Sequence, residues 1–348
     1  MIKLFTDLNT FPKSFLPPIV QYNSSFVYVD SVEECDYVLL PHWEVVYEYT
    51  DNQFGEHNVD PQNKKNIQLA VKELIAIGEA KGKPLIVVYL SDSDKDIPIE
   101  NAIVFRTSLY KSGQKSSVFA YPSWGADFQA DYLNNQPNIR SKNTKPHVGF
   151  RGSAVPLGYS MENFVRSKVN LANSVIGKMN FGFRLPYAWN EGQILRQKAI
   201  KKLISNTNIK SDFAVLTRGY ISQKNATKKA LNRKLFIDNM VHNDYVLCAR
   251  GAGNYSYRLY ETLSAGRIPL FINTDCVLPY DFFIDWKKYC VWVEESEIDR
   301  VDELLLDFHH RLTNDDFMEL QINIRKLWNE WISPQGFFKN FDKHLARC

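Results

Sequence analysis

A glycine-bearing segment near residue 250 has the residue types and spacing that phosphate binding needs. It follows the apolar run 245–249 and precedes a helix predicted to open near Ser256. Its residues are Arg250, Gly251, Ala252, Gly253 and Asn254. Glycines let backbone N–H groups approach a phosphate closely, and a helix N-terminus adds partial positive charge. The segment therefore predicts an anion site.

Two arginines and a glutamate add detail to this prediction. Arg250 in the loop and Arg258 in the first helical turn could each neutralise a diphosphate bidentately. Glu261 follows Arg258 by one turn and could accept hydrogen bonds from two ribose hydroxyls. The alternative is a plain glycine turn with an Arg258–Glu261 surface pair. The combination of cations, helix start and carboxylate favours a nucleotide diphosphate site, with Ser256 at the helix opening.

The elements that must position these residues alternate between strands and helices. The run PLIVVYL at 84–90 is continuous and rich in β-branched residues, as is typical of a parallel strand buried on both faces. Such alternation predicts an α/β chain with open, mostly parallel sheets. Strands are expected at 2–7, 26–30, 37–40, 84–90, 102–108, 118–122, 147–153, 212–217, 245–249, 268–272 and 287–293. Helices are expected at 64–83, 192–206, 229–241, 255–265, 297–312 and 315–332.

The alternation is interrupted once. The stretch NNQPNIRSKNTKP, residues 134–146, is polar, contains two prolines and has no apolar period. It predicts two α/β halves joined by a linker, with a cleft between them. Ligands of open α/β sheets bind at the carboxyl ends of the strands. On that rule, Arg151, Thr217 and Arg218, which close predicted strands or follow them, are further candidate phosphate contacts or else surface-loop residues.

Charge is distributed unevenly along the chain. Residues 1–138 carry 11 basic and 18 acidic side chains, residues 139–234 carry 19 and 3, and residues 235–348 carry 12 and 18. The corresponding net charges are −7, +16 and −6. A basic middle segment favours an anionic ligand, although Lys-rich solvated helices would give the same count. It lacks the interleaved aromatics of nucleic-acid motifs, so no nucleic-acid partner is expected.

Composition excludes several other classes of protein. With 45% hydrophobic and 23% charged residues, the 348-residue chain is neither disordered nor a coiled coil. No run approaches the ~18 apolar residues of a membrane span, and the first residues do not resemble a secretory signal. The five cysteines are odd in number and form no C-x-x-C pair, so a zinc site is not expected. These features predict a reduced, cytoplasmic protein.

The region around the glycine segment resembles the exostosin glycosyltransferase family. The resemblance is close over residues 245–300 and looser elsewhere, where the run Asp36–Pro41 matches an early strand of the family. The matching residues are Cys248, Arg250, Gly251, Gly253, Ser256, Arg258, Glu261, the run Ala265–Pro269, Leu278-Pro279 and Ile284-Asp285-Trp286.

The resemblance implies a GT-B fold, in which two Rossmann-like domains face each other across a cleft. The implied organisation is an acceptor-side domain at 1–140, a linker at 141–146, a nucleotide-sugar domain at 147–325 and a C-terminal helix at 326–348 that returns to the first domain. It further implies a nucleotide-sugar donor, inversion at the anomeric carbon and no cofactor or essential metal.

An inverting transfer needs a base on the acceptor side, which the resemblance places in the N-terminal half. In order of preference, the candidates are Asp92, which follows strand 84–90, and then His42 and Glu44, which follow strand 37–40. Many relatives have a His-Asp pair where this chain has Ser91 to Asp94, so the family pattern does not identify the base. Each candidate could instead be a turn former or helix cap.

We therefore expect an inverting glycosyltransferase that moves a sugar, most simply from a UDP-sugar, to an oligosaccharide or lipid-linked glycan acceptor. This activity would serve glycan, capsule or lipopolysaccharide-type biosynthesis. The enzyme would be cytoplasmic, with peripheral docking on the inner face of a membrane as an open alternative. The competing hypothesis is a protein of the same fold that binds nucleotide sugars or glycans without catalysis.

Overall fold

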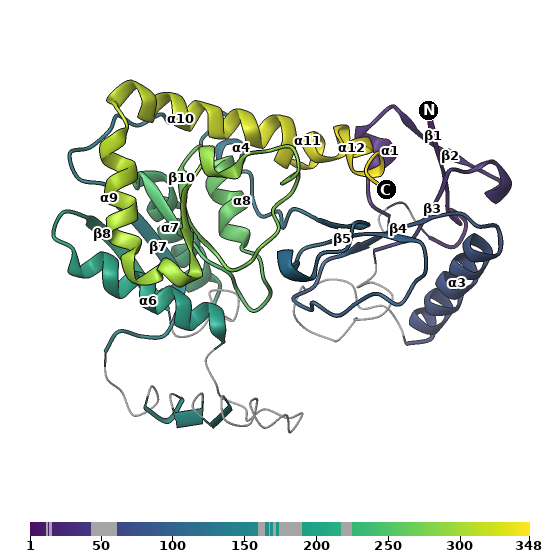
Figure 1. Ribbon diagram of the computed structural model, residues 1–348, viewed down its shortest axis with the longest axis horizontal. Helices are drawn as coiled ribbons and strands as arrows, with labels where there is room; N and C mark the ends of the chain where they lie inside the picture. Colours follow the sequence, from purple (N-terminus) through teal and green to yellow (C-terminus); the bar gives the residue numbers. More distant parts are fainter. Residues whose placement is uncertain are drawn as a thin grey trace.

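The computed structural model describes residues 1–11, 13, 16–42, 61–158, 164–166, 168–169, 172–173, 190–216 and 225–348. These residues build two separate parallel β-sheets, each accompanied by helices (Figure 1). The predicted α/β class is therefore confirmed.

The first sheet has six parallel strands in the order β2-β1-β3-β4-β5-β6. Every residue of β4 is buried, as its β-branched run predicted. The strands are β1 Ile2–Phe5, β2 Phe26–Val29, β3 Tyr37–Leu39, β4 Leu85–Tyr89, β5 Ala102–Arg106 and β6 Val118–Ala120. The α-helices are α1 Ile19–Tyr22, α3 Pro61–Ala80 and α4 Phe128–Tyr132, and the 3₁₀ turns are η2 Val32–Glu34 and η3 Lys111–Gly113.

The second sheet has five parallel strands in the order β11-β10-β9-β7-β8. The strands are β7 His147–Ser153, β8 Lys210–Leu216, β9 Tyr245–Cys248, β10 Ile268–Asn273 and β11 Val291–Glu294. The helices are α6 Glu191–Ser205, α7 Ala226–His242, α8 Tyr257–Ser264, α9 Val301–Arg311 and α10 Asn314–Leu327, with 3₁₀ turns η5 Trp286–Lys288 and η6 Glu295–Arg300. Capping boxes at Asn190 and Thr313 start α6 and α10, so these helices begin close to their predicted positions.

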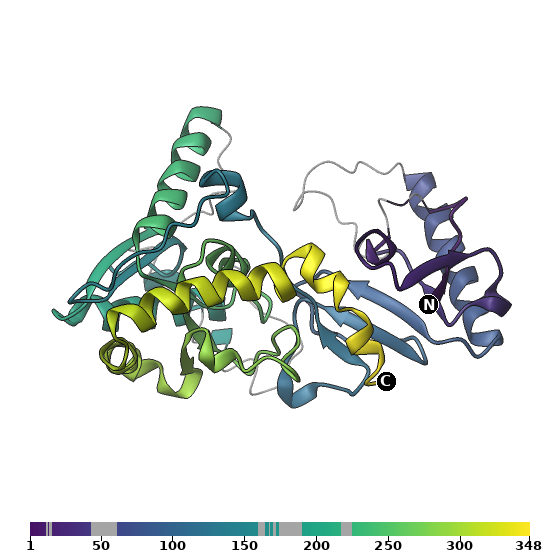
Figure 2. The same cartoon turned by 90° about the horizontal axis from the view of Figure 1, so that it is seen from above.

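The end of the chain leaves the second sheet and packs on the first (Figure 2). After α10 come a π-helical turn, η7 Trp328–Ile332, and the short helices α11 Pro334–Lys339 and α12 Asp342–Leu345. Phe341 is fully buried, and its ring centroid lies 4.5 Å from that of Phe105 in β5. The Asn23 amide donates to the Phe338 carbonyl oxygen at 3.0 Å. The predicted return of the C-terminal helix to the first domain is confirmed.

Loops at the carboxyl ends of the two sheets touch directly. Val277 N donates to Leu109 O at 3.2 Å, and Lys111 N donates to Asp275 O at 2.8 Å. These bonds join the loop after β5 to the loop after β10. The two sheets therefore face each other with the loops after their strands in contact, which is the GT-B arrangement.

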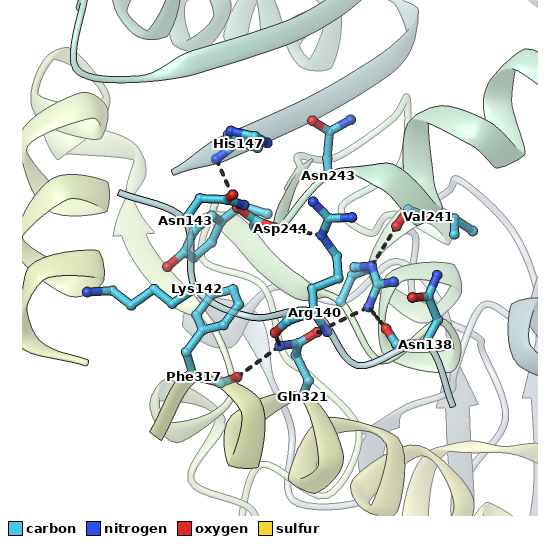
Figure 3. Close-up of polar contacts among 12 residues, drawn as sticks. Asn138, Arg140, Lys142, Asn143, His147, Val241, Asn243, Asp244, Phe317 and Gln321 are labelled. Carbon is cyan, nitrogen blue, oxygen red and sulfur yellow. Dashed lines mark hydrogen bonds and ion pairs between the residues drawn. The ribbon is translucent and has the colours of Figure 1, made fainter. Parts of the chain in front are cut away.

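The polar stretch predicted as a linker forms no helix or strand from 138 to 146, yet it is firmly held (Figure 3). The buried Asp244 carboxylate accepts from Arg140 Nε and Asn143 Nδ2, both at 2.8 Å. The Gln321 amide donates to Arg140 O at 2.8 Å. The buried Arg267 donates to Asn138 O at 2.8 Å. A charged network thus holds the segment that connects the two sheets. The predicted domain boundaries remain a prediction.

His309 connects three parts of the second domain. It lies on α9 and is fully buried. Its Nδ1 lies 2.9 Å from the Tyr245 hydroxyl and its Nε2 lies 2.8 Å from Asn143 O. The side chain fastens α9 to β9 and to the linker, so its role is structural.

The packing of Phe341 predicts a large stability effect. Phe341→Ala should destabilise the protein by about 3–5 kcal/mol, because it empties a ring-sized space between the C-terminal segment and β5. Denaturant unfolding measures the effect, with the exposed Lys339→Ala as control. Equal, small effects of the two substitutions would show that the C-terminal segment does not secure the first sheet.

Candidate active site

A cavity of about 260 Å³ lies at the carboxyl end of the second sheet, beside the glycine segment. Asp92, from the loop after β4, contributes the first sheet's side of the lining. The full lining is Asp92, Arg196, Gly251, Ala252, Tyr255, Ser256, Tyr257, Arg258 and Glu261. Two larger hollows, of about 520 Å³ each, lie beside Trp331 and beside Trp292, away from the predicted site residues. The cavity by the glycine segment is therefore the one that agrees with the sequence prediction.

The glycine loop connects β9 to α8 and requires glycine at position 253. A Cβ on Gly253 would lie 2.8 Å from Asp92 Cα and 2.7 Å from the Tyr255 ring. The Gly253 N–H donates to Asp92 Oδ1 at 3.1 Å. The backbone here lies so close to the loop after β4 that any side chain would force Asp92 or Tyr255 to shift.

Two guanidinium groups border the cavity. Arg258 stacks over Phe150, with 4.4 Å between its Cζ and the ring centroid, and donates to Arg151 O at 2.7 Å. Arg196, from α6, donates to Ser153 O and Ala249 O at 3.0 and 3.1 Å. Burial, together with nearby Arg258, lowers the pKa of Arg196 to about 9. Two half-buried cations placed side by side favour an anion in the cavity.

Arg196 was missed by the sequence analysis. The buried residues of α6 include Gly192, Leu195, Ala199 and Leu203, and Arg196 lies beside this apolar stripe. That position distinguishes it from the exposed Lys201 and Lys202 of the same helix. The apolar period could have singled out this cation from the basic run.

Glu261 lies where the sequence predicted it, on α8 and lining the cavity. It is only 8% exposed, and burial raises the pKa of its carboxyl group although Arg258 and Arg233 oppose that shift. The nearest Arg233 nitrogen lies 3.7 Å from Glu261 Oε1. A Cβ on Gly125 would come within 2.9 Å of the Glu261 side chain, so its position is tightly limited.

Three predicted donor contacts have other partners. Asn254 is fully buried, and its amide binds Leu109 O at 3.2 Å and Thr274 Oγ1 at 2.5 Å. These bonds tie its side chain to the loop after β5 and to Thr274, and its role as a donor contact remains a prediction. Arg250 binds Ala252 O at 3.0 Å and lies 3.3 Å from Glu191, and Arg151 lies 3.3 Å from Asn232. Neither Arg250 nor Arg151 lines the cavity.

The structure separates the candidate bases. Asp92 lines the cavity and is exposed. His42 does not line it, and burial lowers the pKa of its imidazole to about 4. Glu44, Thr217 and Arg218 lie outside the described residues. In the described part of the chain, no three His, Cys, Asp or Glu side chains cluster as metal ligands would.

Residues 180–308 match the family model of the exostosin GT47 domain. A 75-residue segment is 35% identical to probable glucuronosyltransferase 47 A of Physcomitrium patens, covering 22% of this chain and 17% of that protein. A 64-residue segment is 33% identical to Exostosin-1 of Drosophila melanogaster, covering 18% of this chain and 8% of that protein. The chain thus matches about a sixth of the first relative's length.

Two solved structures align with nearly the whole length of the chain. A glycosyltransferase from Rickettsia africae ESF-5 aligns over 99% of this chain and 98% of its own, with 14% identity and a TM-score of 0.38. WaaG, a glycosyltransferase involved in lipopolysaccharide biosynthesis, aligns over 98% of this chain and 99% of its own, with 12% identity and a TM-score of 0.35.

The two parallel sheets, which face each other through the loops after their strands, have the two-domain GT-B arrangement. The match over residues 180–308 confirms the resemblance to the exostosin family found in the sequence.

Glu261 provides a pH test of the site. The raised pKa means that the folded protein holds this proton more tightly than the unfolded chain, so its contribution to stability is lost as pH rises above 4.5. Glu261→Gln should therefore unfold at a higher temperature than wild type at pH 7. The difference should diminish as pH falls through 4.5 and vanish well below it, where the wild-type carboxyl is neutral in both states. A variant less stable than wild type at pH 7 would contradict this account.

Proposed function

We propose that the protein is an inverting glycosyltransferase that uses a nucleotide-sugar donor, most simply a UDP-sugar. The observation that carries this proposal is the cavity bordered by Arg196, Arg258 and Glu261 within the exostosin-type segment. The cations suit a diphosphate, and the carboxylate on the same helix suits the ribose hydroxyls.

In this proposal the charge of the departing diphosphate is stabilised by protein groups instead of a metal ion. Arg196 and Arg258 are fixed by backbone carbonyl oxygens, so their charges are already placed when the bond to the anomeric carbon breaks. Such preorganised groups in a dry site act more strongly than charges in water. The Arg258 guanidinium is also kept in place by the flat Phe150 ring beneath it.

Asp92 supplies the base in this proposal. The acceptor hydroxyl would attack the anomeric carbon from the face opposite the diphosphate, its oxygen forming the new bond as the bond to phosphate breaks. Its proton would pass to the Asp92 carboxylate, which reaches the cavity from the opposing sheet. The acceptor would be a saccharide, free or lipid-linked, of the kind used in glycan, capsule or lipopolysaccharide assembly.

Arg258→Ala tests the donor site. Without the guanidinium, turnover should fall by on the order of 10²–10³, and UDP-sugars should no longer raise the unfolding temperature. The measurement is a thermal-shift screen of UDP-, GDP-, CMP- and dTDP-sugars in EDTA, followed by transfer assays with the donor found. The exposed Arg300→Ala is the control. If nucleotide sugars stabilise Arg258→Ala as much as wild type, the donor's diphosphate does not bind at Arg258.

We also propose that the enzyme works on the cytoplasmic face of a membrane, with α7 on the lipid surface. Most residues of α7 from Ala226 to Leu235 are exposed, including Leu231 at 56% and Leu235 at 39%. It carries Lys228, Lys229 and Lys234 and no acidic side chain before Asp238. Exposed leucines among lysines suit a bilayer containing anionic lipids. No helix among the described residues is long and apolar enough to cross a membrane.

Vesicle flotation tests this surface. Wild type should float with vesicles of phosphatidylcholine and phosphatidylglycerol and less with phosphatidylcholine alone, since each lysine near the surface contributes about 1 kcal/mol. Leu231→Ser/Leu235→Ser and Lys228→Glu/Lys229→Glu should both lose binding. Lys201→Glu/Lys202→Glu, which makes the same charge change on α6, should retain it. Equal loss in both lysine pairs would mean that net charge alone drives the association.

A further inference from the structure

The backbone N–H of Gly253 already has an anionic partner. It donates to Asp92 Oδ1 across a distance of 3.1 Å. Carboxylate and phosphate oxygens are alternative acceptors for the same charge-assisted hydrogen bond. The N–H that the glycine loop would direct at a donor phosphate is therefore occupied by an oxygen of the protein itself.

The Asp92 carboxylate is held by hydrogen bonds and has no cationic partner among the described residues. Its side chain is exposed to the cavity that Arg196 and Arg258 border. Among the described residues, no lysine or arginine forms an ion pair with it. The phenol of Tyr255 lies close enough to add a further hydrogen bond to the carboxylate. The carboxylate can therefore leave Gly253 without breaking a salt bridge.

The surrounding contacts would allow this exchange while the two sheets stay in place. Asn254 N donates to Ser108 Oγ at 3.0 Å, and the Asn254 amide donates to Leu109 O at 3.2 Å. These bonds hold the glycine loop to the first sheet independently of Asp92. Asp92 itself lies on residues 90–99, a connection after β4 that contains no helix or strand. Thr107 Oγ1 donates to Ser91 O at 2.8 Å and the Arg106 guanidinium donates to Ser93 O, so the connection is held on both sides of Asp92. Rotation of the Asp92 side chain alone would make the Gly253 N–H available.

We propose that the Asp92 carboxylate occupies the place of a donor diphosphate oxygen at Gly253, and that the donor displaces it on binding. This inference rests on the proposed function of the site. Two anions cannot share one N–H donor, so donor binding and the Asp92–Gly253 hydrogen bond exclude each other. Displacement frees the carboxylate to accept the acceptor's proton. The base would then be released only after the donor has bound, which disfavours proton transfer in the empty enzyme.

Asp92→Asn separates the two roles of the residue. Removing the competing charge should tighten the binding of UDP and of inorganic pyrophosphate by on the order of tenfold, because a hydrogen bond to a charged group is about twice as strong as a neutral one. Turnover should fall in the same variant because the base is lost. Asp92→Ala should tighten binding at least as much, since it also removes the amide oxygen that in Asp92→Asn could still accept from the Gly253 N–H. Isothermal titration calorimetry in EDTA measures the dissociation constants.

Asp94→Asn is the matched control, because Asp94 is an exposed acidic residue two positions along the same connection and does not line the cavity. Its dissociation constants should equal those of wild type. UDP affinity that is unchanged or weaker in Asp92→Asn would overturn the displacement, and so would equal tightening in Asp94→Asn. Wild type that binds neither UDP nor pyrophosphate would instead overturn the proposed function, and the displacement with it.

Discussion

The packing of the last helices on the first sheet is the constraint on which the site depends. The donor loop belongs to the second sheet and Asp92 to the first, so their contact exists only while the two sheets keep one relative position. Phe341 against Phe105, and Asn23 on the Phe338 carbonyl oxygen, secure that position away from the cavity. Both loops can then carry polar and glycine residues, because apolar packing elsewhere holds the halves together.

The site itself contains charges that are unfavourable for stability. Burial lowers the pKa of Arg196 and raises that of Glu261, and both shifts show that the charged forms are poorly solvated. Hydrogen bonds to backbone carbonyl oxygens keep Arg196 and Arg258 in place without neutralising them. Such uncompensated charge in a cavity is typical of binding and catalytic sites. A diphosphate would supply the missing counter-charge, which explains how the site could work through protein groups alone.

The order of strands and helices was predictable from the sequence, because each strand or helix depends on a local pattern of residues. Five buried residues in β4 and the capping residues of α6 and α10 are signals contained within a few positions. The positions of Ser256, Arg258 and Glu261 in the cavity were predictable for the same reason, because all three lie within the first turns of one helix. Asp92 was predictable as a strand-end residue, although its contact with Gly253 was not.

The remaining assignments depended on contacts between distant parts of the chain. Asn254 resembles a ligand residue in sequence, but its partners lie in the loop after β5 and at Thr274. Arg196 is one of several cations in a basic helix, and only the position of β9 makes it part of the cavity. The structural role of His309 depends on its contact with Asn143 O in the linker, 166 residues away. In each case the role of the side chain depends on contacts with segments that are distant in the sequence.

The central claim is that protein cations bind the donor's diphosphate, and comparing UDP with uridine tests it most directly. Calorimetry in EDTA should show UDP binding to wild type at least a hundredfold more tightly than uridine, because two charge-assisted contacts contribute about 1.5–3 kcal/mol each. That advantage should be lost in Arg196→Ala/Arg258→Ala. Equal affinity for UDP and uridine, or UDP binding that requires a divalent metal, would contradict the account.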